Sequence, residues 1–168
     1  MTNSYLKHLT IREFLGKIKE VSTMSKNYTD FQKKFRLSEL VIVETEYWRW
    51  SVRPVHATLG AGVLSAKRPV ETFSEMTEEE STDLGKMVKF VEETLKKTFF
   101  YNRINYLMLM MVDFHVHFHV IPRYDRDIEF AGITWKDKGW PTPPVLDAEA
   151  IRDDTLFLIR DTLKQNLN

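Results

Sequence analysis

Cysteine is absent from this sequence of 168 residues, and so are an excess of one charge and a long apolar run. Without cysteine the chain forms no disulfides and no thiolate sites, which suits a reducing compartment. Lys and Arg together number 24, as do Asp and Glu, so no overall basic field favours binding to a nucleic acid or a membrane surface. The longest apolar run, residues 106–112, is far shorter than the about 20 residues that cross a bilayer.

The first residues also lack the unbroken apolar stretch of a signal peptide. A hydrophobic content of 43% supports one globular domain with a substantial core. We therefore expect a cytoplasmic protein with a single domain over residues 1–168, and neither a nucleic acid nor a membrane as its partner. Any anionic ligand has to be held by local groups.

Three of the five histidines stand at alternate positions, namely His115, His117 and His119. Successive side chains of a β-strand point to opposite faces, so the three imidazoles would line one face while the apolar residues between them pack inward. A row of titratable groups costs stability unless something uses it, so this pattern predicts a functional site.

Two kinds of site fit an alternating row of imidazoles. Neutral imidazole is a common ligand for zinc, copper, iron or nickel. Alternatively, one imidazole attacks a substrate while its neighbours hold phosphate oxygens and transfer a proton. The spacing alone leaves both kinds of site open.

The wider sequence resembles one known family. Residues 115–121 follow the pattern His-φ-His-φ-His-φ-φ, where φ is apolar, and Pro122-Arg123 follows. This pattern resembles that of the histidine triad (HIT) family, and residues 63–77 resemble the strand, basic turn and helix entry of the same family. The resemblance covers roughly residues 38–125. It implies an α+β, HIT-like fold with an antiparallel sheet of about five strands and one long packed helix.

Local patterns predict the remaining elements. Capping-box patterns begin at Thr10, Thr29 and Thr77, so we expect helices to start there, the third of them long and the second short. We expect an N-terminal helical extension in residues 1–37, and a C-terminal loop and helix, capped by Asp147, in residues 126–168. Residues 104–112 are nearly all apolar and predict a strand that is buried on both faces.

The resemblance also implies a mechanism. The middle histidine, His117, would be the nucleophile that forms a nucleotidyl-histidine, with His119 on a phosphate oxygen and His115 orienting the cluster. The implied activity is that of a hydrolase or transferase acting on a nucleoside phosphate conjugate, such as a dinucleoside polyphosphate or a phosphoramidate. No metal is needed in the site, although Mg²⁺ can accompany the substrate. Family members are often homodimers, so we expect a homodimer.

Five further residues are candidates for substrate binding: Arg53, Asn105, Trp48, Trp50 and Arg123. An ungapped count places Arg53 where the family has an acid or amide on the ribose, which suggests an additional anionic group in the substrate. Asn105 resembles a family asparagine with a shift of one residue. The alternating pair Trp48 and Trp50 is typical of a core or an interface, and its functional alternative is a wall that stacks a nucleobase.

Other positions depart from the family pattern. Gly60-Ala61 stands where a Gly-His pair is usual, and His56 is a nearby candidate to replace that histidine. The sequence Val112-Asp113-Phe114 replaces a phosphate-gripping turn. These departures leave two alternatives open: a catalytically weak HIT-fold protein that binds nucleotides or partners, and a histidine-based metal protein.

Overall fold

The computed structural model of the chain describes residues 10–147 and 150–167. Five strands form one antiparallel sheet in the order β1-β2-β3-β5-β4, and a short two-stranded ribbon is made of β6 and β7. The strands are β1 (Val41–Glu44), β2 (Trp48–Val52), β3 (Gly62–Ala66), β4 (Arg103–Leu107), β5 (His117–Arg123), β6 (Ile128–Phe130) and β7 (Ile133–Trp135). The predicted α+β fold with a five-stranded antiparallel sheet is confirmed.

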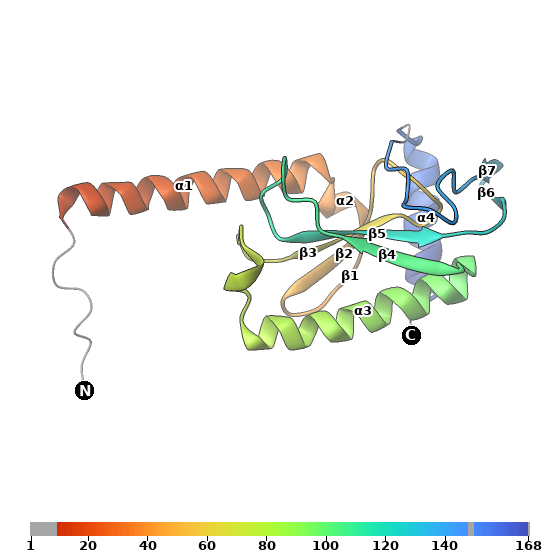
Figure 1. Ribbon diagram of the computed structural model, residues 1–168, viewed down its shortest axis with the longest axis horizontal. Helices are drawn as coiled ribbons and strands as arrows, with labels where there is room; N and C mark the ends of the chain where they lie inside the picture. The colour runs from red at the N-terminus through yellow and green to blue at the C-terminus, as the bar shows by residue number, and fades with distance from the viewer. Residues whose placement is uncertain (1–9, 148–149, 168) are drawn as a thin grey trace.

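Helices α1 and α3 lie on opposite sides of the large sheet (Figure 1). The helical elements are α1 (Ile11–Lys34), α2 (Leu37–Leu40), the 3-10 turn η1 (Phe73–Glu75), α3 (Glu78–Phe99) and α4 (Asp153–Gln165). Helices therefore flank the sheet toward both ends of the chain, as expected. The division of the chain at residues 38 and 125 stays a prediction.

Helix α3 begins at the capping box that the sequence predicts. The hydroxyl of Thr77 accepts a hydrogen bond from the backbone N–H of Glu80 at 3.2 Å, and the Glu80 carboxylate accepts one from the N–H of Thr77 at 2.8 Å. Apolar side chains at helical spacing then face the sheet and are buried in the main core: Met87, Val91, Leu95 and Phe99. Burying each of them contributes about 1.5–3 kcal/mol. Leu156, Ile159 and Leu163 of α4 complete this core.

Helix α1 is one continuous helix, so the predicted helix start at Thr29 is wrong. The Thr29 hydroxyl donates to the carbonyl of Ser25 one turn earlier, as happens inside a helix. The predicted start at Thr10 is confirmed. The first turns project away from the body with Ile11 and Leu15 exposed, whereas the last turns return to the sheet with Phe31 buried (Figure 1).

Two other predicted boundaries are wrong. Strand β4 ends at Leu107, opposite His119, because the chain leaves the sheet there to turn back into β5, and Met111 and Val112 are exposed in this turn. Helix α4 begins at Asp153 instead of near residue 147, since residue 150 is still extended and bridges to Val55.

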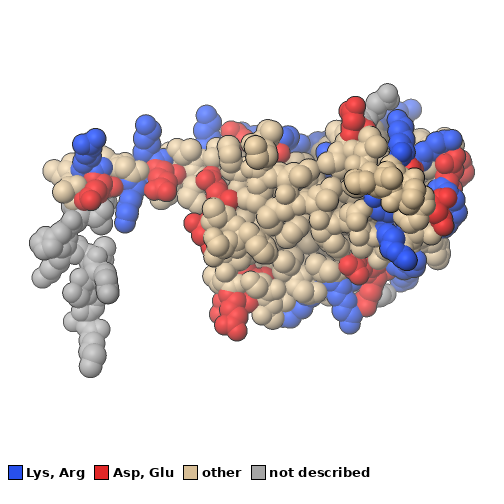
Figure 2. Space-filling model, viewed as in Figure 1, with Lys and Arg blue, Asp and Glu red and all other residues tan. Residues whose placement is uncertain are grey.

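The charges of the molecule are mixed. Acidic and basic side chains lie close to one another along the projecting part of α1 and at the opposite end of the molecule, so this face carries no continuous field of one sign (Figure 2). Of the helices in the described part of the chain, none is long and apolar enough to span a membrane.

Candidate active site

Strand β5 places His117 and His119 on the face of the sheet that α1 covers. His117 pairs with Ser65 of β3, and His119 lies between β3 and β4, opposite Leu107. The alternate residues Phe118 and Val120 point to the other face and pack with the core, as the sequence predicts.

His115 lies two residues before β5 begins, so the expectation that one strand carries all three histidines is wrong in this detail. Its neighbour Val116 still pairs with the chain, because its N–H donates to the carbonyl of Val70 at 2.9 Å and its carbonyl accepts from the N–H of Ala66 at 3.2 Å. His115 therefore stays on the same side of the sheet, with its ring 4.7 Å from that of Phe31.

The hydrogen bonds of the three rings define their tautomers. Nδ1 of His117 lies 2.7 Å from the carbonyl of His115, and a carbonyl only accepts, so Nδ1 carries the proton and Nε2 keeps a lone pair. Nε2 of His119 lies 3.3 Å from that Nε2 and donates to it. Nε2 of His115 donates to the carbonyl of Ala66 at 2.8 Å. The middle imidazole is thus held as a nucleophile would be.

Burial keeps the row neutral. Desolvation lowers the pKa of His115 and of His119 from 6.5 to about 4, and it also lowers the pKa of His117. The hydrogen bond to Ala66 opposes this effect at His115, whereas the neighbouring His117 reinforces it at His119. The three imidazoles are therefore unprotonated near pH 7, which is the form that can attack an electrophile.

The end of α1 covers the row. The ring of Phe31 lies 4.9 Å from that of His117, and the ring of Phe35 lies 5.7 Å from the same imidazole and 5.9 Å from that of His119. His117 has a relative exposure of 0%. Sequence reasoning missed this cover, although the spacing of Phe31 and Phe35 by four residues marks one face of a helix.

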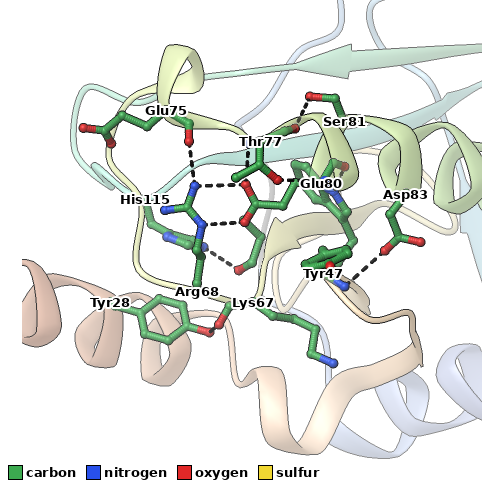
Figure 3. A network of polar contacts seen from close by, with 12 residues as sticks. Tyr28, Tyr47, Lys67, Arg68, Glu75, Thr77, Glu80, Ser81, Asp83 and His115 are labelled. Atoms are coloured by element: carbon green, nitrogen blue, oxygen red, sulfur yellow. Dashed lines mark hydrogen bonds and ion pairs between the residues drawn. The ribbon is translucent and has the colours of Figure 1, made fainter. Parts of the chain in front are cut away.

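A polar network holds the turn that follows β3 (Figure 3). The carbonyl of Lys67 accepts from the hydroxyl of Tyr28 on α1 at 2.5 Å, next to the carbonyl that binds His115. Arg68 donates to the carboxylate of Glu80 at 2.9 Å, which ties the same turn to the start of α3. This turn therefore joins the histidine row to helices on both sides of the sheet.

A cavity of about 320 Å³ opens beside His119, with Lys34, Phe35, Arg53 and Asp113 among its lining residues. Nη1 of Arg53 is buried there and has no hydrogen-bond partner within the described part of the chain. A buried guanidinium nitrogen without a partner is costly, so it favours an anionic ligand at this place. The structure thus places Arg53 in the same cavity as His119; its role in substrate binding stays a prediction.

Arg123 binds Asn105 and lies away from the histidines. Arg123 donates to the amide oxygen of Asn105 at 2.8 Å and to the carboxylate of Asp137 at 2.6 Å. It stands four residues beyond His119 on β5, which is about 13 Å along a strand. The structure therefore gives Arg123 bonds to Asn105 and to the loop of residues 136–142, and does not place Arg123 at the histidine row.

The expected nucleobase wall of Trp48 and Trp50 does not form. Both indoles have a relative exposure of 0% and belong to the core on the face opposite the histidines. Nε1 of Trp48 donates to the carbonyl of Glu80 at 2.8 Å, which binds β2 to α3. The alternation was predicted correctly, but the burial of both faces of the sheet assigns these rings to packing.

His56 is not part of the row either. Its ring is buried, with its centroid 5.5 Å from that of Trp135, and neither ring nitrogen bonds to any residue that the structure describes. Burial lowers the pKa of His56 from 6.5 to about 3. In the described residues, no group of three or more His, Asp or Glu side chains is arranged to hold a metal ion.

Residues 60–126 match the family model described as the HIT domain. The chain carries a HIT domain. The match spans β3, α3, β4 and β5 with all three histidines, whereas α1 and Arg53 lie before it. No curated protein matches the sequence.

Solved structures share the fold of this HIT domain and its flanking elements. A histidine triad (HIT) protein from Sinorhizobium meliloti has a TM-score of 0.63 at 20% identity, over 79% of this chain and 93% of that one. A histidine triad protein from Bradyrhizobium japonicum has a TM-score of 0.61 at 19% identity, over 79% and 95%. A hypothetical histidine triad nucleotide-binding protein from Sulfolobus tokodaii has a TM-score of 0.59 at 19% identity, over 76% and 82%. At these identities the likeness concerns the fold.

Proposed function

We propose that this chain is a nucleotidyl hydrolase or transferase that cleaves a nucleoside phosphate conjugate through a covalent intermediate on His117. The observation that carries the proposal is the tautomer of this ring. Nδ1 donates to the carbonyl of His115, so the neutral Nε2 presents a lone pair toward the site.

The reaction then proceeds in two balanced steps. Nε2 of His117 attacks the phosphorus next to the nucleoside; a P–N bond forms while the bond from phosphorus to the leaving group breaks with its electron pair. The Nε2 proton of His119, which now points to His117, turns to a phosphate oxygen and neutralises charge there. Water or another acceptor next attacks the same phosphorus, and the P–N bond breaks with its electron pair returning to Nε2. The acceptor's proton passes to the leaving group released in the first step, so the imidazole is neutral again. Splitting one difficult displacement into two lowers each barrier.

The proposal includes the finer properties expected from the sequence: a nucleotide-type small molecule as substrate, a homodimer, a cytoplasmic location and no metal in the site. Mg²⁺ can accompany the substrate's phosphates. Light scattering during gel filtration tests the homodimer. Turnover in a chelator, with and without added Mg²⁺, tests the need for metal.

The central experiment is rapid-quench mass spectrometry under turnover, with dinucleoside polyphosphates and nucleoside phosphoramidates as substrates. The wild-type protein should show a nucleotidyl adduct on His117. In His117→Asn the adduct should be absent, and the turnover rate should fall by about a thousandfold or more, as it does when other enzymes lose their nucleophile. His56→Asn is the matched control, because this buried histidine lies outside the row. Turnover that survives His117→Asn unchanged would refute the proposal.

A second candidate function rests on the complete burial of His117. His117 is shielded from solvent, and the segment Val112-Asp113-Phe114 before the row differs from the family pattern. Both features also fit a HIT-fold protein that binds nucleotides and hydrolyses them slowly. Nucleotide binding without hydrolysis or adduct across the same substrates would favour this second function.

A further inference from the structure

Two cations and one anion surround the cavity beside His119. The ammonium of Lys34 lies 2.7 Å and 2.9 Å from the two carboxylate oxygens of Asp113, and Arg53 lines the same cavity. Lys34 comes from the last turn of α1, whereas Asp113 stands two residues before His115. Three separate parts of the chain therefore bring their charges to one place.

The two cations are in different states. Arg53 has a buried Nη1 that bonds to none of the described residues. Lys34 has Asp113 as its counterion, in a pair whose lysine side chain is 51% exposed and whose aspartate side chain is 16% exposed. Such a half-exposed pair contributes about 0–1 kcal/mol, so a better anion can displace the carboxylate.

All three charges act on the catalytic rings. Lys34 and Arg53 lower the pKa of His117 and of His119, while Asp113 raises both. Because the three charged residues line the same cavity as His119, they can meet a phosphate chain that extends from the row into this cavity. With neutral histidines, their sum is one positive charge.

This net charge of the cavity distinguishes between two classes of substrate. The phosphorus of a phosphoramidate carries one negative charge, which Arg53 balances while Lys34 stays with Asp113. A polyphosphate chain carries at least one further charge for each additional phosphate, and that charge needs a second cation.

We propose that Lys34 binds the phosphates beyond the one that is attacked, and that the substrates are nucleoside polyphosphate conjugates. While the site is empty, the carboxylate of Asp113 takes the place of these phosphates and holds Lys34. This inference rests on the proposed function for the identity of the attacked phosphorus. Lys34 is followed by Phe35, whose ring contacts His117 and His119, so the proposed phosphate ligand stands next to the cover of the row.

The test compares ligands that differ only in phosphate number. Calorimetry measures the dissociation constants of AMP and ATP, and of GMP and GTP, for the wild type, Lys34→Met and Asp113→Asn. Lys33→Met is the matched control, because Lys33 is the adjacent exposed residue of the same helix. We expect Lys34→Met to weaken triphosphate binding tenfold or more and monophosphate binding less than threefold. Asp113→Asn should tighten triphosphate binding about threefold to tenfold, and Lys33→Met should change neither.

Equal losses for monophosphate and triphosphate in Lys34→Met, or losses no larger than those of Lys33→Met, would overturn the inference. A thermal melt of each variant shows that it is folded. Failure here is distinct from failure of the proposed function, since the nucleotidyl adduct on His117 is measured separately and does not depend on Lys34. If no adduct forms, the difference between the triphosphates and the monophosphates still decides the role of Lys34.

Discussion

Lowering the pH from 7 to 5 is expected to destabilise this fold through its buried histidines. His56, His115 and His119 are all at least nine-tenths buried, and burial lowers their pKa from 6.5 to about 3, about 4 and about 4. In the unfolded chain the same groups bind protons as the pH falls through 6.5. The contribution of these neutral rings to the free energy of unfolding is therefore fully present above about pH 6.5 and is lost as the pH falls toward 4.

The size of the loss follows from proton linkage. Between pH 7 and pH 5 an unfolded histidine takes up nearly one proton while a buried one stays neutral, which costs about 2 kcal/mol for each ring. The three rings together cost about 6 kcal/mol. A domain of this size is stable by roughly 5–15 kcal/mol, so most of that stability is at risk at pH 5.

Urea unfolding at pH 7, 6 and 5, followed by tryptophan fluorescence, measures this effect. His56→Leu removes a ring whose two nitrogens have no partner among residues 10–147 and 150–167, so it should reduce the difference in unfolding free energy between pH 7 and pH 5 by about 2 kcal/mol. Carboxylates remain largely ionised over this range and do not mask the result. A wild-type unfolding free energy that changes by less than about 1 kcal/mol would refute the reasoning.

Two further predictions concern stability. Gly60 has a φ of +78°, and a Cβ there would lie 2.9 Å from Cδ2 of Leu95, so Gly60→Ala should cost about 1–3 kcal/mol in thermal unfolding. Gly16→Ala, in open space on α1, is its control and should not destabilise; equal effects would contradict the strain argument. Asp137→Ala leaves Arg123 buried without its counterion and should cost about 3–5 kcal/mol, whereas Asp137→Leu combined with Arg123→Met should cost less. A double variant as unstable as the single one would contradict this account.

Local signals predicted much of the fold because they act over a few residues. The capping boxes at Thr10 and Thr77 join positions three apart, and both helices begin there. The alternation of His117 and His119 with apolar residues predicted which side chains share a face. The same alternation does not show which face of the sheet packs against which helix. From the sequence, Trp48 and Trp50 therefore fitted both packing in the core and stacking of a nucleobase.

The parts of the site that the sequence did not predict depend on contacts between distant segments. The cover of His117 by Phe31 joins residues 86 positions apart in the numbering, and neither residue carries a local mark of the other. Lys34 and Asp113 meet only because α1 crosses the sheet beside the turn before β5. The hydrogen bond from His115 to the carbonyl of Ala66 likewise joins residues that are distant in the sequence.

The region that sequence comparison recognises is smaller than the unit that has to fold. Residues 60–126 hold the three imidazoles, yet the aromatic rings that exclude solvent from them come from α1 and the residue after it. A fragment excised at those limits would also lack β1 and β2, and with them two strands of the sheet. Such a fragment would present its imidazoles to bulk water with ordinary acidities, so chemistry measured on it would describe a different solvent environment from that of the whole chain.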